Sequence, residues 1–239
     1  MGFGKYSQKI SAEDILHEDN HLLIINKYPT EIVQADKTGD IPLVDKVREY
    51  IKVRDNKPGN VFMGLVHRID RPVSGALIFA KTGKALLRMS ELLKEREIRK
   101  IYWAVVKNPP PRQSDHLLQY LRRNRKRNKS FAYSKEVRNS QKAELKYKLL
   151  AESDNYFLLE VELLTGRHHQ IRVQLSSIGC PIKGDVKYGF DRTNEDASIH
   201  LHSRKLEFIH PVKKEKISIV AGIPHADNLW DHFQKVIAK

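Results

Sequence analysis

Residues 65–82 read LVHRIDRPVSGALIFAKT and place one carboxylate, Asp70, between two arginines on a turn. Pro72 and Gly75 break the chain just before residues 76–80, whose unbroken apolar character is typical of a buried strand. A reactive group on a loop held by rigid strands is a common arrangement in active sites. The stretch therefore makes Asp70 a candidate catalytic residue. The alternative is that its carboxylate only pairs with a neighbouring arginine and stabilises the turn.

The composition favours a folded protein with a polyanionic partner. The chain has 239 residues, of which 40% are hydrophobic, so it is long enough to bury a substantial core. Lysine and arginine total 43 against 29 acidic residues, which gives a formal charge of +14. A charge of this sign and size makes nucleic acid the expected partner rather than an acidic protein.

Cysteine content and hydropathy indicate the compartment. Cys180 is the one cysteine, so an internal disulfide framework and a multi-cysteine zinc site are excluded, and a buried structural role is expected for it. No run of 18 apolar residues exists, and the first residues lack the apolar segment of a secretory signal. We therefore expect a soluble cytoplasmic protein without a membrane partner.

Apolar periodicity predicts an α+β fold. Helices are expected over residues 41–52 and 84–96 and from near His168 to a stop at Gly179. Strands are expected over residues 21–27, 76–80, 101–106, 143–150, 156–164, 205–209 and 216–220. Many strands with few helices between them favour a mixed, largely antiparallel sheet flanked by helices and loops over a doubly wound parallel sheet. One domain over residues 1–239 is expected.

Residues 121–129 form a basic run without one acidic residue. This segment is expected to be an exposed, flexible stretch that contacts nucleic-acid phosphates without sequence preference. The alternative is a solvated basic loop without a binding role. The candidate phosphate-binding residues are Arg122, Arg123, Arg125, Lys126, Arg127 and Lys129.

Residues 165–172 read TGRHHQIR and gather donors at the edge of an expected helix, where they could face a phosphate or a base. Two adjacent histidines suggest a metal site, but consecutive helical residues point about 100° apart. No cysteine or paired carboxylate completes such a site. Hydrogen bonds to the backbone or contacts to phosphate are therefore favoured for His168 and His169, and no metal is expected.

The sequence resembles the RluA-type pseudouridine synthases. The resemblance is carried by HRID at residues 67–70, followed by Ser74-Gly75 and Lys81-Thr82. Further motifs of that family follow its order along the chain. They cover residues 15–27, 96–106, 165–185 and 201–211.

The resemblance implies an isomerase that cleaves the bond between uracil N1 and ribose C1′, turns the base and rejoins it through C5, without a cofactor. Asp70 would be the nucleophile, and departure of uracil leaves an electron-poor C1′ that a carboxylate can trap. Arg172 would pair with Asp70 and keep it ionised, whereas the alternative is an unpartnered surface arginine. Tyr102 would stack on the uracil and assist removal of the C5 proton, whereas the alternative is an ordinary strand aromatic.

The same resemblance implies that the target uridine leaves its stack to reach Asp70. Arg68 would fill the space left by the extruded nucleotide. Arg71, Arg167 and His169 complete the candidate RNA contacts, with backbone phosphate as the expected partner of Arg167. Ribosomal or transfer RNA is the expected substrate. The protein is expected to be a monomer without an obligate protein partner.

Only about a dozen residues precede the first motif, so a bare catalytic domain without an N-terminal RNA-binding module of the S4 type is expected. Two other functions remain open from the residues. One is an RNA-binding or RNA-folding protein that uses the same basic surface without chemistry. The other is a metal-dependent nuclease, against which the scarcity of clustered acidic residues speaks.

Overall fold

The computed structural model describes residues 9–224 and 227–238. The expectations about a secretory signal and a preceding module concern the start of the chain, where residues 1–8 lie outside the described residues. The chain divides into two compact units, each built from two separate stretches. Unit 1 comprises Met1–Ile98 with Lys205–Gly222, and unit 2 comprises Arg99–Arg204 with Ile223–Lys239. The division into compact units does not test the expectation of one domain over residues 1–239, which stays a prediction.

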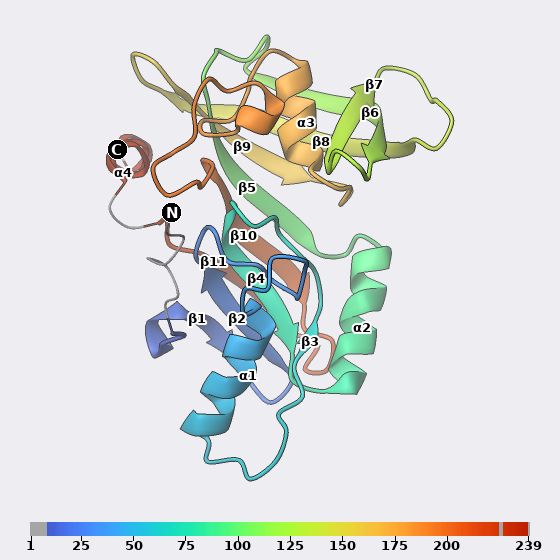
Figure 1. The fold of residues 1–239 in the computed structure, drawn as a ribbon, viewed down its shortest axis with the longest axis vertical. Coiled ribbons are helices and arrows are strands. Elements are labelled where there is room, and N and C mark those ends of the chain that lie inside the picture. The colour runs from blue at the N-terminus through green and yellow to red at the C-terminus, as the bar shows by residue number, and fades with distance from the viewer. Residues whose placement is uncertain (1–8, 225–226, 239) are drawn as a thin grey trace. The chain divides into compact units, whose positions relative to one another are not determined.

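Unit 1 is built on antiparallel strands with two helices beside them (Figure 1). Neighbouring strands follow the order β1-β2-β4-β10, with β3 paired to β4 and β11 paired to β10. Strand β10, Leu201–Ile209, begins in unit 2 and ends in unit 1. The other elements of unit 1 are β1 (Ile15–Glu18), β2 (Leu22–Lys27), α1 (Leu43–Arg54), β3 (Gly64–Leu65), β4 (Ser74–Ala80), α2 (Gly83–Lys94) and β11 (Lys216–Val220), preceded by the short 3-10 helix η1 (Ala12–Asp14).

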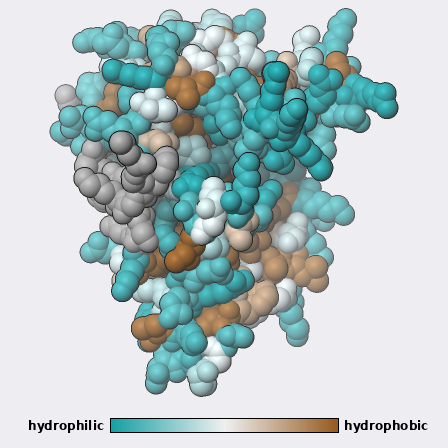
Figure 2. All heavy atoms as spheres, in the orientation of Figure 1, coloured by the Kyte–Doolittle hydropathy of each residue, from teal (hydrophilic) through white to brown (hydrophobic). Residues whose placement is uncertain are grey.

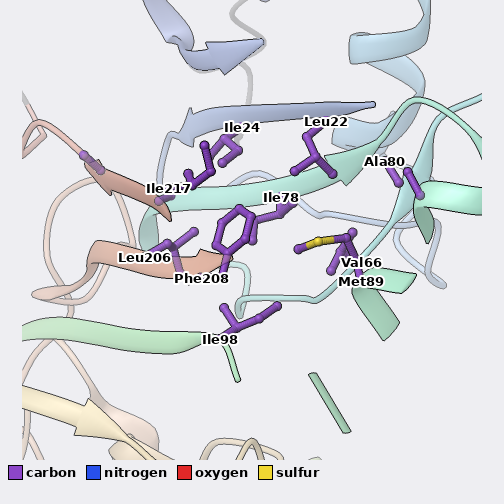
Figure 3. Close-up of a cluster of buried hydrophobic side chains, with 13 residues drawn as sticks. Leu22, Ile24, Val66, Ile78, Ala80, Met89, Ile98, Leu206, Phe208 and Ile217 are labelled. Atoms are coloured by element: carbon purple, nitrogen blue, oxygen red, sulfur yellow. The ribbon is translucent and has the colours of Figure 1, made fainter. Parts of the chain in front are cut away.

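The core of unit 1 explains why β4 reads as an unbroken apolar run. All seven residues of β4 are buried. Figure 3 shows Ile78 of β4 among Ile24 of β2, Phe208 of β10 and Met89 of α2. Helix α2 begins at its N-cap Thr82, whose side chain accepts a hydrogen bond from Ala85 N at 3.1 Å. Burial of these side chains fixes β4, and with it the turn that precedes the strand.

Unit 2 contains a second antiparallel arrangement, in the order β5-β9-β8-β6-β7. Helix α3 contacts β6 and β7 of this arrangement, and α4 contacts β8. The elements are β5 (Arg99–Val106), β6 (Ser114–Asn124), β7 (Lys129–Tyr133), β8 (Gln141–Glu152), β9 (Phe157–Leu163), α3 (Gln170–Ser177), the 3-10 helix η2 (Val186–Tyr188) and α4 (Asn228–Ile237).

Two helices of unit 2 have clear end signals. The Asp227 carboxylate caps α4 by accepting hydrogen bonds from Leu229 N at 2.9 Å and Trp230 N at 3.0 Å. Trp230 and Phe233 of α4 then pack with buried residues of β5, β8 and β9. Helix α3 ends just before Gly179, whose φ of +82° lies in the left-handed region that glycine adopts without strain.

Most expectations about the fold are confirmed. The α+β class, the largely antiparallel sheet and the predicted helices and strands are all present, with bounds shifted by a few residues. The expectation that residues 121–129 form a flexible stretch is wrong. That segment is the end of β6, a tight turn and the start of β7, because β6 pairs with both β7 and β8.

Candidate active site

Asp70 lies on a tight turn in unit 1, immediately before β4. The Val73 N–H donates to the Asp70 carbonyl at 3.0 Å and closes the turn. Upstream, the His67 ring nitrogen Nε2 accepts a hydrogen bond from Ile78 N at 3.2 Å, which fastens the approach to the turn onto β4. Ile69 is buried and Asp70 is half-buried. The turn is therefore anchored to β4 at both ends, upstream through His67 and downstream because β4 begins at Ser74.

The two arginines of this turn have different surroundings. Arg71 Nη2 lies 2.7 Å from Asp40 Oδ2, so its ion pair is made outside the turn. Arg68 is exposed, and its insertion into an RNA stem stays a prediction. Whether Asp70 acts as a nucleophile or serves only as the partner of a neighbouring arginine stays a prediction.

Lys27, at the end of β2, is a residue of this site that the sequence analysis missed. Its side chain is 1% exposed, and Nζ donates to the carbonyls of Tyr28 at 2.7 Å, Glu31 at 3.0 Å and Arg71 at 3.1 Å. The ammonium thus ties β2 to the residue that follows Asp70. A lysine that ends an otherwise buried apolar strand is the signal that could have revealed it.

Burial lowers the pKa of Lys27 to about 7, and the nearby carboxylates of Glu31 and Asp70 oppose this shift. Asp70 and Lys27 are therefore electrostatically coupled. By reciprocity, a proton on Lys27 favours the ionised form of the Asp70 carboxylate.

The lowered pKa predicts a pH-dependent contribution of Lys27 to stability. An unfolded chain keeps its lysine protonated to near pH 10.5, whereas folded Lys27 releases its proton near pH 7. The unfolded state binds more protons between these values, so stability rises with pH there, by at most about 1.4 kcal/mol per pH unit. Urea unfolding at several pH values should show the free energy of unfolding of the wild type rising relative to Lys27→Met. For the exposed control Lys94→Met, the difference in free energy of unfolding from the wild type should not change with pH. A pH-independent difference for Lys27→Met would contradict the prediction.

Tyr102 lies in unit 2, on β5 opposite Val161 of β9, and is 5% exposed. It belongs to the six consecutive buried residues that end β5. The side chain is thus held by a strand in the interior of the sheet. Its role in catalysis stays a prediction.

Arg172 of α3 is buried and forms a bidentate ion pair with Asp185. Nε lies 2.7 Å from Oδ2 and Nη2 lies 2.9 Å from Oδ1 of that carboxylate. The guanidinium also lies 5.1 Å from the centre of the Tyr188 ring. Arg172 is therefore not the surface arginine of the alternative interpretation. Its expected partner Asp70 belongs to unit 1, so that pairing stays a prediction, and Asp185 is a partner that the sequence analysis missed.

The histidines at the start of α3 make internal contacts. Their rings stack with centroids 3.8 Å apart. His169 is buried with a φ of +54°, and its Nδ1 lies 2.9 Å from Tyr188 Oη. His168 Nδ1 lies 2.9 Å from Ser130 Oγ on β7. Both of these ring partners are side-chain hydroxyls, whereas backbone groups or phosphates were expected, and contact of His169 with RNA stays a prediction.

Arg167, the next candidate, is half-buried. Its Nε donates to the Lys142 carbonyl at 3.0 Å, which orients the guanidinium along β8. A guanidinium has five N–H donors, so this bond leaves others for a phosphate. The RNA contact of Arg167 stays a prediction.

The predicted phosphate-binding residues gather on the β6–β7 hairpin. The Arg123 and Arg127 side chains are exposed on β6 and the turn, and Lys129 opens β7. Asn128 fastens the turn, because its Oδ1 lies 3.1 Å from His168 Nε2 and its carbonyl accepts from Lys187 Nζ at 3.2 Å. Hydrophilic side chains cover this part of unit 2 in Figure 2. The hairpin is thus an ordered basic surface.

Three further observations bear on cofactors and membranes. Within residues 9–224 and 227–238, no three histidine, cysteine, aspartate or glutamate side chains are grouped so that they could hold a metal ion. No helix in the same ranges has the length and apolar character needed to cross a membrane. Cys180 is buried, as expected, and burial raises the pKa of its thiol to about 11.

Comparison with known proteins connects these features to a family. The model of the RNA pseudouridylate synthase family matches residues 21–177. A ribosomal large subunit pseudouridine synthase C of Buchnera aphidicola is 37% identical over 226 residues, covering 87% of this chain and 67% of that protein. A ribosomal large subunit pseudouridine synthase D of Zymomonas mobilis is 32% identical and covers 88% of this chain and 69% of that protein.

The fold agrees with this assignment. The solved structure of human RNA Pseudouridylate Synthase Domain Containing 4 superposes with a TM-score of 0.77 at 24% identity, over 94% of this chain and 92% of that one. At this identity the likeness concerns the fold alone. The family model and the two relatives establish that the chain belongs to the RNA pseudouridylate synthase family, in its RluA-type branch, and is an RNA pseudouridine synthase, an isomerase.

Proposed function

We propose that this enzyme converts particular uridines of structured ribosomal or transfer RNA into pseudouridine, with Asp70 as the nucleophile. The observation that carries the proposal is the position of Asp70 on a turn fixed by β4 and coupled to the buried Lys27. Relatives named as ribosomal large subunit enzymes support ribosomal RNA as one substrate. The buried free thiol of Cys180 supports a reducing compartment such as the cytoplasm.

In the proposed reaction the target uridine is flipped out of its stack, which costs least in a loop or a distorted stem. The exposed Arg68 would occupy the space that the nucleotide leaves. Cleavage of the N1–C1′ bond leaves an electron-poor C1′, which the Asp70 carboxylate traps while uracil carries the bonding electrons. The base turns, and C5 bonds to C1′ as the Asp70 carboxylate departs. The C5 proton is then lost with assistance from Tyr102, and N1 takes up a proton from solvent, which gives neutral pseudouridine.

Arg172 is proposed to balance the negative charge of Asp70. Asp185 engages Nε and Nη2 of its guanidinium, and Nη1 is not bound by that carboxylate. A neighbouring cation favours the charged form of a carboxylate and thus the nucleophilic state of Asp70. The role of Asp185 is then to orient Arg172 in the interior of unit 2.

The experiment that tests this function is release of tritium from RNA labelled at uridine C5. Ribosomal and transfer RNA pools from a strain that lacks the protein are incubated separately with the intact enzyme. Release is expected from at least one pool, and the responding pool identifies the substrate class. Binding to both pools without any release would contradict the enzyme proposal and favour the RNA-binding alternative.

The β6–β7 hairpin is proposed to bind backbone phosphates. Each phosphate contact contributes about 0.7–0.9 to the slope of log affinity against log salt concentration. Exchanging the hairpin's basic residues for glutamine should weaken RNA binding, flatten this slope and spare the rate of the chemical step. The exchanged residues are Arg122, Arg123, Arg125, Lys126, Arg127 and Lys129.

A matched control exchanges six exposed basic residues of unit 1 for glutamine. Binding of both variants is measured between about 50 and 200 mM salt, where phosphate contacts have a large effect. Equal losses in the two variants would show a general charge effect and contradict a specific role of the hairpin. The control residues are Lys37, Lys52, Lys57, Lys84, Arg88 and Lys94.

A further inference from the structure

Lys100 lies on β5 and has no counter-ion among residues 9–224 and 227–238. It precedes Tyr102 by two residues, and side chains two apart on a strand project from the same face of the sheet. The side chain is half-buried, and it makes no hydrogen bond or ion pair with the residues described at positions 9–224 and 227–238. Its neighbour Arg99, by contrast, pairs with Glu162 at 2.7 Å.

The ammonium of Lys100 lies beside Gly166, in the connection between β9 and α3. A Cβ built on Gly166 would lie 3.9 Å from Lys100 Nζ, and it meets nothing else within 4 Å. Gly166 is exposed, and its N–H has no acceptor in the described part of the chain. The missing side chain therefore leaves an opening through which a ligand can reach the ammonium from solvent.

The connection that carries Gly166 is held rigidly. Thr165 Oγ1 donates to Gln170 Oε1 at 2.7 Å, and the Arg167 N–H donates to the same oxygen at 2.9 Å. Gln170 Nε2 in turn donates to the Glu144 carbonyl at 3.0 Å. The opening beside Lys100 is thus a fixed feature of unit 2, and a ligand there would be bound without the cost of ordering a loop.

An ammonium in these surroundings is costly without an anion. Burial lowers the pKa of Lys100, and in the described part of the chain no carboxylate opposes this shift. A lysine placed there for packing alone would be more stable as an apolar residue. The surroundings therefore suit a ligand that brings its own negative charge, and the phosphodiesters of RNA do so.

We propose that Lys100 and the Gly166 N–H bind a backbone phosphate next to the target uridine. The inference rests on the proposed function, in which Tyr102 on the same face of β5 stacks on the uracil. Successive same-face residues are about 6–7 Å apart along a strand. That spacing suits a base on Tyr102 with its flanking phosphate on Lys100. The contact would fix the position of the flipped nucleotide, so Lys100 is a substrate-binding residue.

The test measures binding of a synthetic hairpin RNA whose loop holds one uridine. A second RNA carries neutral methylphosphonate linkages on both sides of that uridine. All protein variants in this assay also carry Asp70→Asn, so that the uridine is not isomerised during the measurement. The neutral linkages should weaken binding about 10-fold when Lys100 is present, and they should have almost no effect in Lys100→Gln. The Lys100→Gln substitution should also lower the slope of log affinity against log salt concentration by about 0.7–0.9. Lys100→Arg should retain most binding, and the exposed control Lys148→Gln should behave as the parent.

Equal penalties from the neutral linkages in the parent and in Lys100→Gln would overturn the proposal. So would a Lys100→Gln enzyme with unchanged affinity and a reduced rate of isomerisation, since the charge would then act on the departing uracil. Gly166→Leu provides a second variant in case Lys100→Gln does not fold, because it leaves Lys100 in place and covers the ammonium from the solvent side. It should reproduce the loss of binding.

Failure of this inference is distinguishable from failure of the proposed function. Tritium release by the enzyme with Asp70 intact reports the function, and it does not depend on the outcome of the binding cycle. The linkage-dependent penalty is measured without catalysis. Release without that penalty would overturn only the phosphate contact, whereas the penalty without release would contradict only the enzyme proposal.

Discussion

Asp70→Asn is expected to abolish pseudouridine formation while leaving RNA binding within a few-fold of the wild type. Asparagine has the shape of aspartate but lacks the negative charge and the nucleophilic oxygen that would trap C1′. Removal of a nucleophile lowers a rate by about a thousandfold or more. The turn should survive the change, because it is closed by the backbone bond from Val73 N to the Asp70 carbonyl. Tritium release and filter binding on the same RNA measure the two properties.

The matched control for this variant is Asp40→Asn. Asp40 is an exposed carboxylate of the same unit, and it pairs with Arg71 of the same turn. Exposed ion pairs contribute little to stability, so this change should reduce activity only slightly. Comparable losses in the two variants would indicate that charge near the turn matters in general and would contradict a nucleophilic role of Asp70. Full activity of Asp70→Asn would do the same.

The local features of the fold could be predicted from the sequence. An apolar run directly after Pro72 and Gly75 is typical of a buried strand that follows a turn, and the amphipathic spacing of residues 84–96 predicts α2. The hairpin β6–β7 was missed because its apolar residues are sparse and its basic residues are typical of a loop. Strand β6 pairs with β8, which is a long-range interaction that no local pattern reports, and β7 in turn pairs with β6.

In the candidate site, too, some residues could be predicted from the sequence and others could not. The resemblance placed Asp70, Tyr102 and Arg172, since motif residues are recognisable from their neighbours in sequence. The partners of these residues were not recognisable. Lys27 comes to the Asp70 turn through the pairing of β2 with β4, and Asp185 reaches Arg172 only because the chain returns after α3. Both depend on tertiary packing.

The second large effect is expected for Asp185→Asn. The substitution keeps the shape of the side chain but removes the charge from a buried bidentate pair, and it points an amide NH₂ at the guanidinium of Arg172. Breaking a buried ion pair by changing one partner typically costs about 3–5 kcal/mol. For a chain of this size that corresponds to a fall in Tm of about 6–20 °C. Thermal unfolding measures the shift, and activity should fall as well, because Arg172 loses the carboxylate that orients it.

Two further variants separate loss of the pair from local damage. Asp191→Asn changes an exposed carboxylate that pairs with Lys107 in the same part of unit 2, and it should shift Tm by no more than a degree or so. Replacing both partners, in Arg172→Met with Asp185→Leu, removes the buried charges together and should recover part of the stability lost in Asp185→Asn. It should not recover activity, because the proposed counter-charge of Asp70 is gone. A double variant less stable than Asp185→Asn would show that the two side chains contribute mainly through packing, and the expected role of their charges would be wrong.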